Sequence, residues 1–512
     1  MRIVWDERNR LWGGGSHLAG GAPWRLLRLS SRARPVVQRL SAAGPAGIDP
    51  TTPLEVAVTR WLVARGLAHP QPPPRTTGRD DVVVIIPTHG RPDLLDACLA
   101  GLGPTPAVVV DDASPDPGSI RAVCRTHGAT YLAHTVNRGP GAARNTGLAA
   151  TTAPTVVFLD SDCTVSPRWL DRLVGHLDDD RVGLVAPRVR PRPDGDSAIA
   201  RHEHTRSALD MGRRPELVTH GARLGFLPSA ALVVRRSAIP PGGFEPTMRV
   251  GEDVDLVWRM IDAGWLARYE PSVTVRHEMR LRPSAWVGRR YDYGTSAAAL
   301  DRRHPGRLAP ARLSGWNLAI AALVTLGRFR SAGAVGTVAV AALTRGADHT
   351  TRVDLAVRVA SKGLVADVAA SGHALRREWW PLGWLALLAI PRSRWGRLAA
   401  VSMLGPIVSE YVRERPPLDP LRYVGLRLVE DAAYGSGVIV GAARRRHPRL
   451  LLPEVRLPGV PASRSVMARL RSRRRGRPTA AHGGGREAGS PTAREPDDIE
   501  RRTPAPTTRR AQ

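Results

Sequence analysis

Two acidic residues separated by one serine, Asp160 and Asp162, have the types and spacing that most clearly indicate chemistry in this sequence. They follow Val156–Leu159, an apolar run typical of a buried strand in a parallel sheet. The carboxyl end of such a strand is where α/β sheets bind ligands. Two close carboxylates repel each other, and burial penalises both charges. A divalent cation with oxygen ligands would remove these costs, and a nucleotide diphosphate is the usual reason to hold one there.

The alternative is structural, because a strand followed by an Asx turn at Asp160 or Asp162 would give the same pattern. Other stretches favour the ligand-binding interpretation. In the first, the apolar residues Ile85 and Ile86 lead into a proline turn, which predicts that Thr88 and Arg91 emerge at the same edge of the sheet.

A second stretch, Val108–Val110, is an apolar strand that ends in another acid pair, Asp111 and Asp112. A carboxylate at that edge can accept the imide N–H of a uracil ring. The sequence therefore predicts a nucleoside site beside the Asp160 pair.

A third stretch, Asn137–Asn145, combines glycines with Pro140 and two arginines, Arg138 and Arg144. Glycine lets the backbone approach a ligand, proline suits a first helical turn, and a helix N-terminus favours a phosphate. Taken alone, the glycines would equally fit an ordinary turn.

A fourth stretch places Glu252, Asp253 and Asp255 directly after Gly251, where an apolar stripe predicts that a helix begins. An acidic first turn stabilises a helix by roughly 1 kcal/mol, and this is the structural alternative for any one of these acids. Three acids within four residues also suit a catalytic base held at a rigid helix start.

From Asp81 onward, strand patterns and helix patterns alternate along the chain. This alternation predicts an α/β domain over residues 80–305, with a mostly parallel sheet and helices on both faces, and this domain must position the residues named above. Residues 1–75 form a small α+β unit with short strands, a helix over Leu54–Leu67 and a proline-rich linker. Residues 306–455 contain apolar runs of about 12 residues, which are too short to span a bilayer. They predict a helical, membrane-associated region. Residues 456–512 are predicted to be a disordered basic tail.

The composition of the chain argues against several classes of function. The chain has 512 residues and a net charge of +29, yet Lys362 is the only lysine, which indicates a GC-rich genome rather than a nucleic-acid ligand. No basic stripe with interleaved aromatic residues is present in the sequence. Three cysteines match no metal-ligand spacing and indicate a reducing compartment. The N-terminus lacks an apolar signal core, so we expect a cytoplasmic protein.

These stretches occur in the order and spacing of the family 2 glycosyltransferases, which the chain resembles over about residues 80–300. The resemblance implies the GT-A fold and inverting sugar transfer from a nucleotide sugar. It also implies a role for each matched residue: uracil at Asp112, ribose at Asp160, a divalent metal (Mg²⁺ or Mn²⁺) at Asp162, the general base at Asp253 beside Glu252, the nucleoside at Thr88 and Arg91, and the diphosphate near Arg144.

The sequence departs from the family pattern at Cys163, where many members have a further aspartate. A second acid on the metal therefore cannot be assumed. His277 follows the strand-like Val273–Val275 and could reach the metal from the far side. A core histidine with satisfied hydrogen bonds is the alternative for that residue.

The whole chain resembles a narrower branch of the family, the mycofactocin-biosynthesis glycosyltransferases of actinobacteria. Residues 1–75 also resemble the PqqD-type peptide-recognition fold. These resemblances imply transfer of a hexose, glucose, from a UDP-sugar to a peptide-derived redox cofactor precursor, which builds a β-1,4-linked oligosaccharide. They also imply that residues 1–75 recruit the peptide or a pathway partner.

Two other functions are weighed against this one. The first is a membrane-associated transferase that builds a cell-envelope polysaccharide or a glycolipid, and the second is a binding module without catalysis. The presence of both Asp162 and Asp253 argues against the binding module. Arginines near the C-terminus would attract an anionic surface, so we expect association with the inner face of the membrane.

Overall fold

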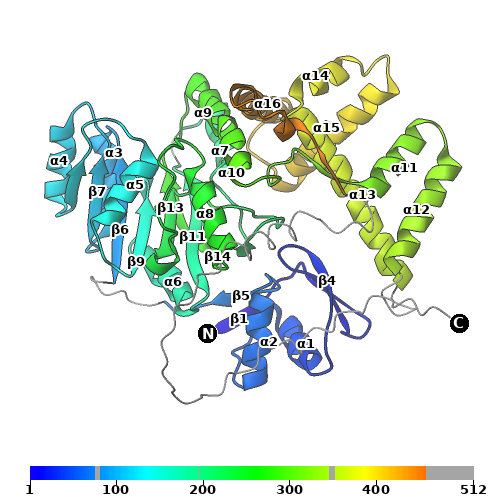
Figure 1. Ribbon diagram of the computed structural model, residues 1–512, viewed down its shortest axis with the longest axis horizontal. Coiled ribbons are helices and arrows are strands. Elements are labelled where there is room, and N and C mark those ends of the chain that lie inside the picture. Colours follow the sequence, from blue (N-terminus) through cyan, green and yellow to red (C-terminus); the bar gives the residue numbers. More distant parts are fainter. Residues whose placement is uncertain (75–80, 194, 345–351, 457–512) are drawn as a thin grey trace, which may run out of the picture.

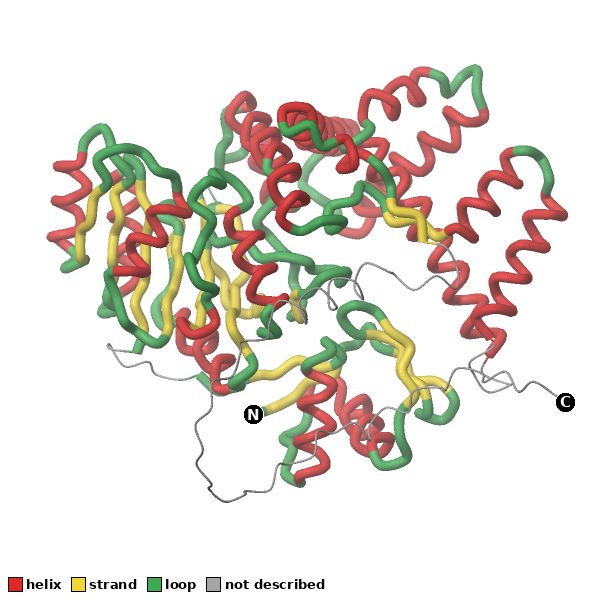
Figure 2. The backbone as a smooth tube through the Cα atoms, viewed as in Figure 1, coloured by secondary structure: helices red, strands yellow, loops and turns green. Residues whose placement is uncertain are grey.

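The computed structural model describes residues 1–74, 81–193, 195–344 and 352–456 (Figures 1 and 2). Figure 1 shows an α/β unit on the left, a small N-terminal unit below it and a set of helices at the upper right. The predicted tail over residues 456–512 lies outside the described residues, apart from its first residue.

Half of the central sheet follows the predicted alternation of strands and helices. Its four strands run parallel in the order β9-β6-β7-β8. They are β6 (Val82–Thr88), β7 (Ala107–Asp111), β8 (Thr130–Ala133) and β9 (Thr155–Leu159). The helices between them are α3 (Pro92–Leu102), α4 (Pro117–Thr126) and α5 (Pro140–Ala149). Because helices cover this half of the sheet, its valine- and isoleucine-rich strands are largely buried.

The other half contains antiparallel pairs. β13 (Ala231–Arg235) runs antiparallel between β9 and β11 (Val182–Pro191), and β11 pairs in parallel with β14 (Leu266–His277). Two short strands, β10 (Cys163–Thr164) and β12 (Glu216–Val218), run antiparallel to β14. Three helices belong to this half: α6 (Trp169–Gly175), α7 (Ala198–Thr205) and α8 (Glu252–Asp262). The resulting nine-stranded sheet confirms the predicted α/β fold.

The N-terminal unit has its own core, in which Leu18, Leu40 and Leu62 are fully buried. Its strands are β1 (Arg2–Trp5), β2 (Arg10–Trp12), β3 (His17–Gly20), β4 (Arg25–Arg28) and β5 (Ala68–Gln71). Its helices are α1 (Ala33–Ala43) and α2 (Pro53–Val63). The sequence pattern missed α1, and α2 ends before the predicted Leu67.

Charged contacts attach this unit to the underside of the central sheet. The guanidinium of Arg8 pairs with Glu216 of β12, with Nη2 2.9 Å from Oε2. Arg268 of β14 is buried and donates from Nη2 to the carbonyl of Val63 at 2.9 Å. The two units therefore share a partly buried polar interface.

The C-terminal region is helical. Its helices are α9 (Pro283–Thr295), α10 (Ala297–Arg303), α11 (Gly315–Thr325), α12 (Phe329–Thr344), α13 (Arg352–Arg376), α14 (Trp380–Leu388), α15 (Arg394–Glu414) and α16 (Pro420–Arg444). A short parallel pair, β15 (Arg312–Ser314) and β16 (Glu454–Arg456), closes the region. Among the described residues, every helix is too short or too polar to cross a bilayer.

Glycines let α16 lie directly along α9. A Cβ atom added at Gly294 would lie 2.0 Å from the carbonyl oxygen of Tyr434, and one at Gly437 would lie 2.1 Å from that of Tyr291. No larger residue fits at either position without separating the helices. This contact fixes α16 against α9, although the sequence analysis did not predict α13 or α16.

Candidate functional site

A cleft of about 1470 Å³ lies between the carboxyl edge of the sheet and the helices α7, α9, α15 and α16. Of the nine predicted site residues, all but Arg91 line it. They are Thr88, Asp112, Arg144, Asp160, Asp162, Glu252, Asp253 and His277. The structure thus brings together residues from β6, β7, α5, β9, α8 and β14.

The register of one short strand pair brings His277 to the Asp160 pair. β10 follows Asp162 directly and pairs with β14 so that Cys163 lies opposite His277. As a result, His277 Nε2 lies 3.4 Å from Asp162 Oδ1. Asp160, Asp162 and His277 each offer one ligand atom, and these atoms lie within 4.8 Å of one another.

These three residues fit a divalent metal ion. Asp162 Oδ1 is buried, and apart from the approach of His277 it makes no hydrogen bond among the described residues, whereas buried polar atoms in folded proteins almost always have a partner. Two carboxylates and an imidazole are suitable ligands for a divalent cation. His277 is partly exposed in the cleft rather than enclosed in the core, which favours the ligand interpretation.

Arg144 occupies a different position from the predicted one. It is buried, and its Nη2 lies 2.6 Å from Asp160 Oδ1 while its Nη1 lies 2.8 Å from Glu252 Oε1. Gly139, with a φ of 91°, provides the left-handed turn that starts α5 and directs this side chain inward. Because both terminal nitrogens bind carboxylates, the contact of Arg144 with a diphosphate stays a prediction.

The acids at the start of α8 have separate environments. Burial raises the pKa of Glu252 to about 7, with Asp253 adding to the rise and Arg144 opposing it. Asp253 is only partly buried, and its Oδ2 accepts a hydrogen bond from the Ser229 amide at 3.0 Å. Asp255 faces away from the cleft and bonds to His304 Nε2 at 2.8 Å. Asp253 is therefore the acid of this helix that is best placed to meet a substrate.

Asp112 organises the loop that precedes α5. Its Oδ1 accepts the Arg138 amide at 2.8 Å and lies 2.7 Å from His134 Nδ1, and its Oδ2 accepts the Gly139 amide at 2.7 Å. An ionised carboxylate has about four acceptor sites. One site on Asp112 thus remains for a ligand such as the predicted uracil.

Of the two residues predicted after β6, only one lies at the site. Thr88 is buried on the cleft wall and donates to the Gly90 carbonyl at 3.3 Å. Arg91 adopts a φ of 57°, is exposed and pairs with Asp93 at 3.1 Å. Arg91 does not line the cleft, but its guanidinium interacts electrostatically with the cleft residues Glu278 and Asp162. Its contact with a nucleoside therefore stays a prediction.

The cleft is also lined by arginines that the sequence analysis did not predict, among them Arg190 and Arg289. Arg190 on β11 has a buried Nε without an acceptor among the described residues. Arg289 on α9 stacks over Tyr293 at 4.7 Å. Burial lowers the pKa of Arg289, but neighbours that include Tyr293 and Asp160 more than offset this, and the net shift is upward. One sequence signal could have indicated Arg190: arginines occupy alternate positions of this strand, at Arg188 and Arg190.

Proteins similar to this chain are glycosyltransferases. Residues 83–239 match Glycosyl transferase family 2. Over 467 residues the chain is 38% identical to the pre-mycofactocin glycosyltransferase of Mycobacterium tuberculosis (strain ATCC 25618 / H37Rv). The alignment covers 88% of this chain and 97% of that protein. It is 26% identical over 213 residues to glycosyltransferase AglE of Haloferax volcanii. That alignment covers 39% of this chain and 67% of AglE. A solved mannosyltransferase from Pyrobaculum calidifontis, in complex with GDP-Man and Mn²⁺, aligns with a TM-score of 0.36 and 22% identity over 73% of this chain and 98% of that one.

Proposed function

We propose that this chain transfers glucose from a UDP-sugar to a peptide-derived redox cofactor precursor. The chain belongs to glycosyl transferase family 2 and is a glycosyltransferase of the pre-mycofactocin type. Its central unit has the GT-A fold of that family. The observation that carries the proposal is that one cleft holds the Asp160–Asp162–His277 group together with Asp253.

The geometry supports an inverting mechanism. Asp253 would take the proton of the acceptor hydroxyl as that oxygen attacks the anomeric carbon of the sugar. The new C–O bond forms on the face opposite the leaving group, the bond between that carbon and the phosphate oxygen breaks, and UDP departs with the bond electrons. A divalent cation held by Asp162, His277 and Asp160 would supply neutralising charge to the diphosphate.

The described residues have further roles around this step. Asp112 has one acceptor site left for the imide N–H of uracil. Arg190 and Arg289 line the same cleft, and we assign their guanidinium groups to the diphosphate in place of Arg144. Arg144 would instead hold Asp160 and Glu252 at a fixed separation. The glycosidic product would be β-1,4-linked if the acceptor presents its 4-hydroxyl to Asp253.

Residues 1–75 would recruit the peptide part of the acceptor. None of the described residues of this unit lines the cleft, but the rim residue Arg214 lies 3.9 Å from Glu7. Within the described residues, the outer edge of β4 pairs with no other strand, and such an edge can accept an extended peptide.

A second candidate function is a membrane-associated transferase for a cell-envelope polysaccharide or a glycolipid. The observation that favours it is an exposed apolar surface on α11, α12, α14 and α15. Its most exposed side chains are Leu326 (69%), Phe329 (68%), Leu388 (76%) and Val401 (68%). Surfaces of this kind mark interaction sites in soluble proteins.

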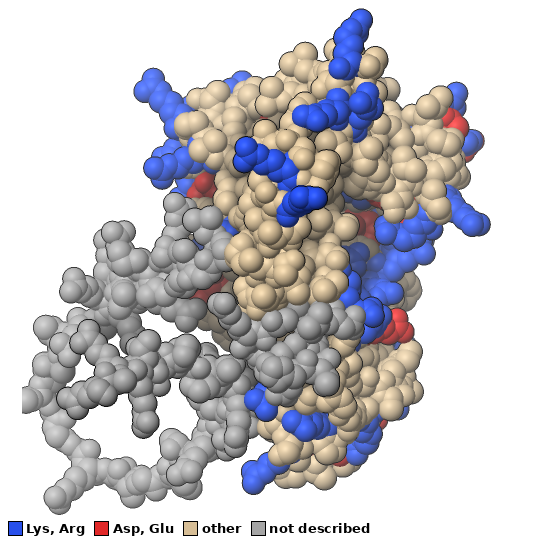
Figure 3. Space-filling view, turned by 90° about the vertical axis from the view of Figure 1, so that its right-hand side faces the viewer, with Lys and Arg blue, Asp and Glu red and all other residues tan. Residues whose placement is uncertain are grey.

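The charges on these helices favour an anionic lipid surface. Within residues 315–342 and 357–409, the exposed charged residues are all basic, and they include Arg328, Arg330 and Arg394. Figure 3 views the molecule from this side and shows a largely uncharged surface that carries basic side chains both within it and at its edges. Each arginine near an anionic bilayer contributes roughly 1 kcal/mol to the free energy of membrane binding. We therefore extend the proposal to include association with the inner face of the membrane.

The decisive experiment is incubation of the purified protein with several UDP-sugars and candidate acceptors, read by mass spectrometry. We expect the mass of one or more hexose residues to appear on the peptide-derived acceptor. Transfer to a lipid-linked or polysaccharide acceptor alone would support the second candidate and overturn the first.

A further inference from the structure

The short strand β12 lies between two loops that line the cleft. The loop before it, residues 206–215, lines the cleft with residues 207–214. The loop after it, residues 219–230, contributes Phe226 and Ser229 among others. We call these the α7–β12 loop and the β12–β13 loop. A contact that holds β12 in place therefore also fixes where both loops meet the cleft.

The sheet alone holds β12 weakly. β12 is three residues long, and β14 is its only strand partner among the described residues. Its register places Glu216 opposite Tyr269 and Val218 opposite Ala267. So short an edge strand gains few hydrogen bonds from its ladder. The local stability of β12 therefore depends on contacts from outside the sheet.

The N-terminal unit supplies such a contact through Arg8. Its Nη2 lies 2.9 Å from Glu216 Oε2, and its Nη1 bonds to Oε1 of the same carboxylate, so the pair is bidentate. Asp6 holds the guanidinium from behind, with Arg8 Nε 2.9 Å from Asp6 Oδ1. The hydrogen bonds from Asp6 and Glu216 raise the pKa of Arg8 above its ordinary value. Glu216 itself is buried, so this pair is its main source of neutralising charge.

Close packing accompanies the ion pair. Gly66 of the N-terminal unit has a φ of 66°, and a Cβ atom added there would lie 3.2 Å from Leu217 Cβ. One residue group earlier on the chain, Arg214 lies 3.9 Å from Glu7. The N-terminal unit thus contacts the end of the α7–β12 loop and the first two residues of β12.

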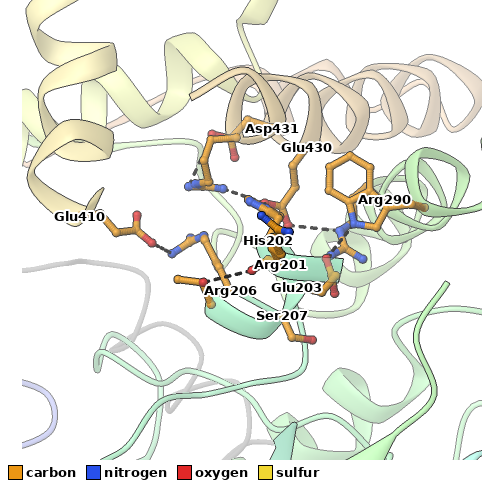
Figure 4. Close-up of polar contacts among 12 residues, drawn as sticks. Arg201, His202, Glu203, Arg206, Ser207, Arg290, Glu410, Glu430 and Asp431 are labelled. Atoms are coloured by element: carbon orange, nitrogen blue, oxygen red, sulfur yellow. Dashed lines mark hydrogen bonds and ion pairs between the residues drawn. The ribbon is translucent and has the colours of Figure 1, made fainter. Parts of the chain in front are cut away.

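The α7–β12 loop is also anchored at its other end. Figure 4 shows Arg206, directly after α7, beside Glu410 of α15, and its Nη1 lies 2.7 Å from Oε1. Midway along the loop, Asp210 accepts hydrogen bonds from Arg188 of β11 at 2.8 and 2.6 Å. The Arg8 contact completes this set at the β12 end. The loop is therefore held by ion pairs to three separate elements.

The β12–β13 loop connects β12 to α8, the helix that carries Asp253. The amide of Ser229 donates to Asp253 Oδ2 at 3.0 Å. Further along the helix, Trp258 Nε1 donates to the carbonyl of Gly225 at 2.7 Å. An amide that donates to a carboxylate restricts its rotation. This loop therefore sets the orientation in which Asp253 faces the cleft.

We propose that Arg8 is a positioning residue for the reaction, which acts through Glu216, β12 and the β12–β13 loop on Asp253. The inference rests on the proposed function, because Asp253 is the general base assigned there. It gives the N-terminal unit a role besides peptide recruitment, since the unit supports the loop that orients the base. A misplacement of about 1 Å far from the chemistry can cost roughly 100-fold in rate, so a remote ion pair can control turnover.

Hydrogen exchange of the full chain, read by mass spectrometry, tests the link between the units without any ligand. Arg8→Met removes the ion pair, and Glu216→Gln keeps the side-chain shape while removing its charge. Each variant should speed exchange in residues 219–230 about 10-fold, because loss of a charge-assisted hydrogen bond favours local opening. Exchange in β6, β7 and β9, which do not contact the pair, should stay at the wild-type rate.

Arg60→Met is the matched control. Arg60 lies on α2 of the same unit and donates to Asp180 at 3.1 Å across the same interface, but neither residue lines the cleft. This variant should leave exchange in residues 219–230 unchanged. Arg8→Lys keeps the charge and should stay close to the wild type.

Hydrolysis of UDP-glucose in the presence of Mn²⁺ tests the effect on catalysis. Water replaces the acceptor in this reaction, so recruitment of a peptide does not enter the rate. Arg8→Met and Glu216→Gln should each lower kcat about 10-fold with KM for UDP-glucose unchanged. The double variant should be no slower than the slower single variant, because both changes remove the same contact.

The outcomes separate this inference from the proposed function. If calorimetry shows that the wild type binds no UDP with Mn²⁺, the proposed function fails, whereas the exchange experiment still decides the link between the units. Wild-type exchange in residues 219–230 of both site variants, or a wild-type kcat, would overturn the positioning role of Arg8. An equal effect in Arg60→Met, or a change in KM alone, would also overturn it. Melting temperatures identify a variant that does not fold, and Glu216→Gln, the milder change, then decides the test.

Discussion

Arg144 Nη1 lies 2.8 Å from Glu252 Oε1, and the pair is buried beneath the cleft. The same arginine reaches Asp160 at 2.6 Å. One cation therefore links an acid at the end of β9 to the first acid of α8. This contact separates the roles of Glu252 and Asp253, because only Asp253 is left free of an arginine to accept a proton from a substrate.

The raised pKa of Glu252 predicts a pH-dependent stability. Its carboxyl group has a folded pKa of about 7 against an ordinary value of 4.5. Between these values the folded state holds a proton that the unfolded state has lost, so stability falls as pH rises from about 4.5 to 7. The loss in the free energy of unfolding should be about 3 kcal/mol in total. Thermal unfolding of the wild type and Glu252→Gln measures it.

Glu252→Gln should show a flatter stability profile across that window, since the amide does not titrate. Glu245→Gln, which is near the protein surface, is the matched control and should keep the wild-type slope between pH 5 and 7. Parallel profiles for the wild type and Glu252→Gln would contradict the assignment of the raised pKa to Glu252.

Asp253→Asn should lower turnover by roughly 10²–10⁴-fold, the usual contribution of a general base. Affinity for UDP should stay near the wild-type value, because Asp253 contacts the acceptor rather than the nucleotide. Steady-state kinetics with calorimetry of UDP separates the two effects. Asp262→Asn, at the exposed end of the same helix, should retain turnover. A silent Asp253→Asn with an inactive Glu252→Gln would move the base to Glu252.

Asp162→Asn and His277→Gln should each weaken UDP binding only when Mn²⁺ is supplied. Both variants remove a ligand from the group whose atoms lie within 4.8 Å, and coordination by the remaining residues is then incomplete. Calorimetry of UDP with and without Mn²⁺ provides the measurement. His127→Gln, at the C-terminal end of α4 and outside the cleft, serves as the control. Unchanged metal-dependent affinity in both site variants would remove the metal assignment.

Asp112→Asn should lower both thermal stability and UDP affinity. The carboxylate accepts two backbone amides and faces His134, so the amide side chain leaves at least one buried donor without a good acceptor. Such a loss costs about 1–3 kcal/mol. If UDP affinity falls while the melting temperature stays constant, Asp112 acts on the ligand alone and does not organise the loop.

Membrane association predicts that Leu385→Asp combined with Leu388→Asp weakens binding to phosphatidylglycerol vesicles. Both side chains are more than half exposed on α14, so the charges should disrupt lipid contact without disturbing the core. Vesicle flotation measures the bound fraction. Leu54→Asp, on α2 of the N-terminal unit, is the matched exposed control. Failure of the wild type to float with vesicles at low salt would exclude the proposal.

Sequence alone was sufficient for the part of the site that lies at strand ends. Thr88, Asp112, Asp160 and Asp162 each follow an apolar run, and parallel strands bring their carboxyl ends to one edge of the sheet. The start of α8 was also predictable, because glycine, acids and an apolar stripe together indicate a helix N-terminus. These signals are local, so the chain encodes them within a few residues.

Tertiary structure decided the contacts between distant segments. Arg144 and Glu252 lie 108 residues apart in sequence, and no local pattern shows that they pair or that the arginine is thereby withdrawn from the ligand. The approach of His277 to Asp162 depends on the register between β10 and β14, which is set by the packing of the whole sheet. The contact between Arg290 of α9 and Glu430 of α16 likewise forms only after the chain has folded, because glycines let these two helices pack closely.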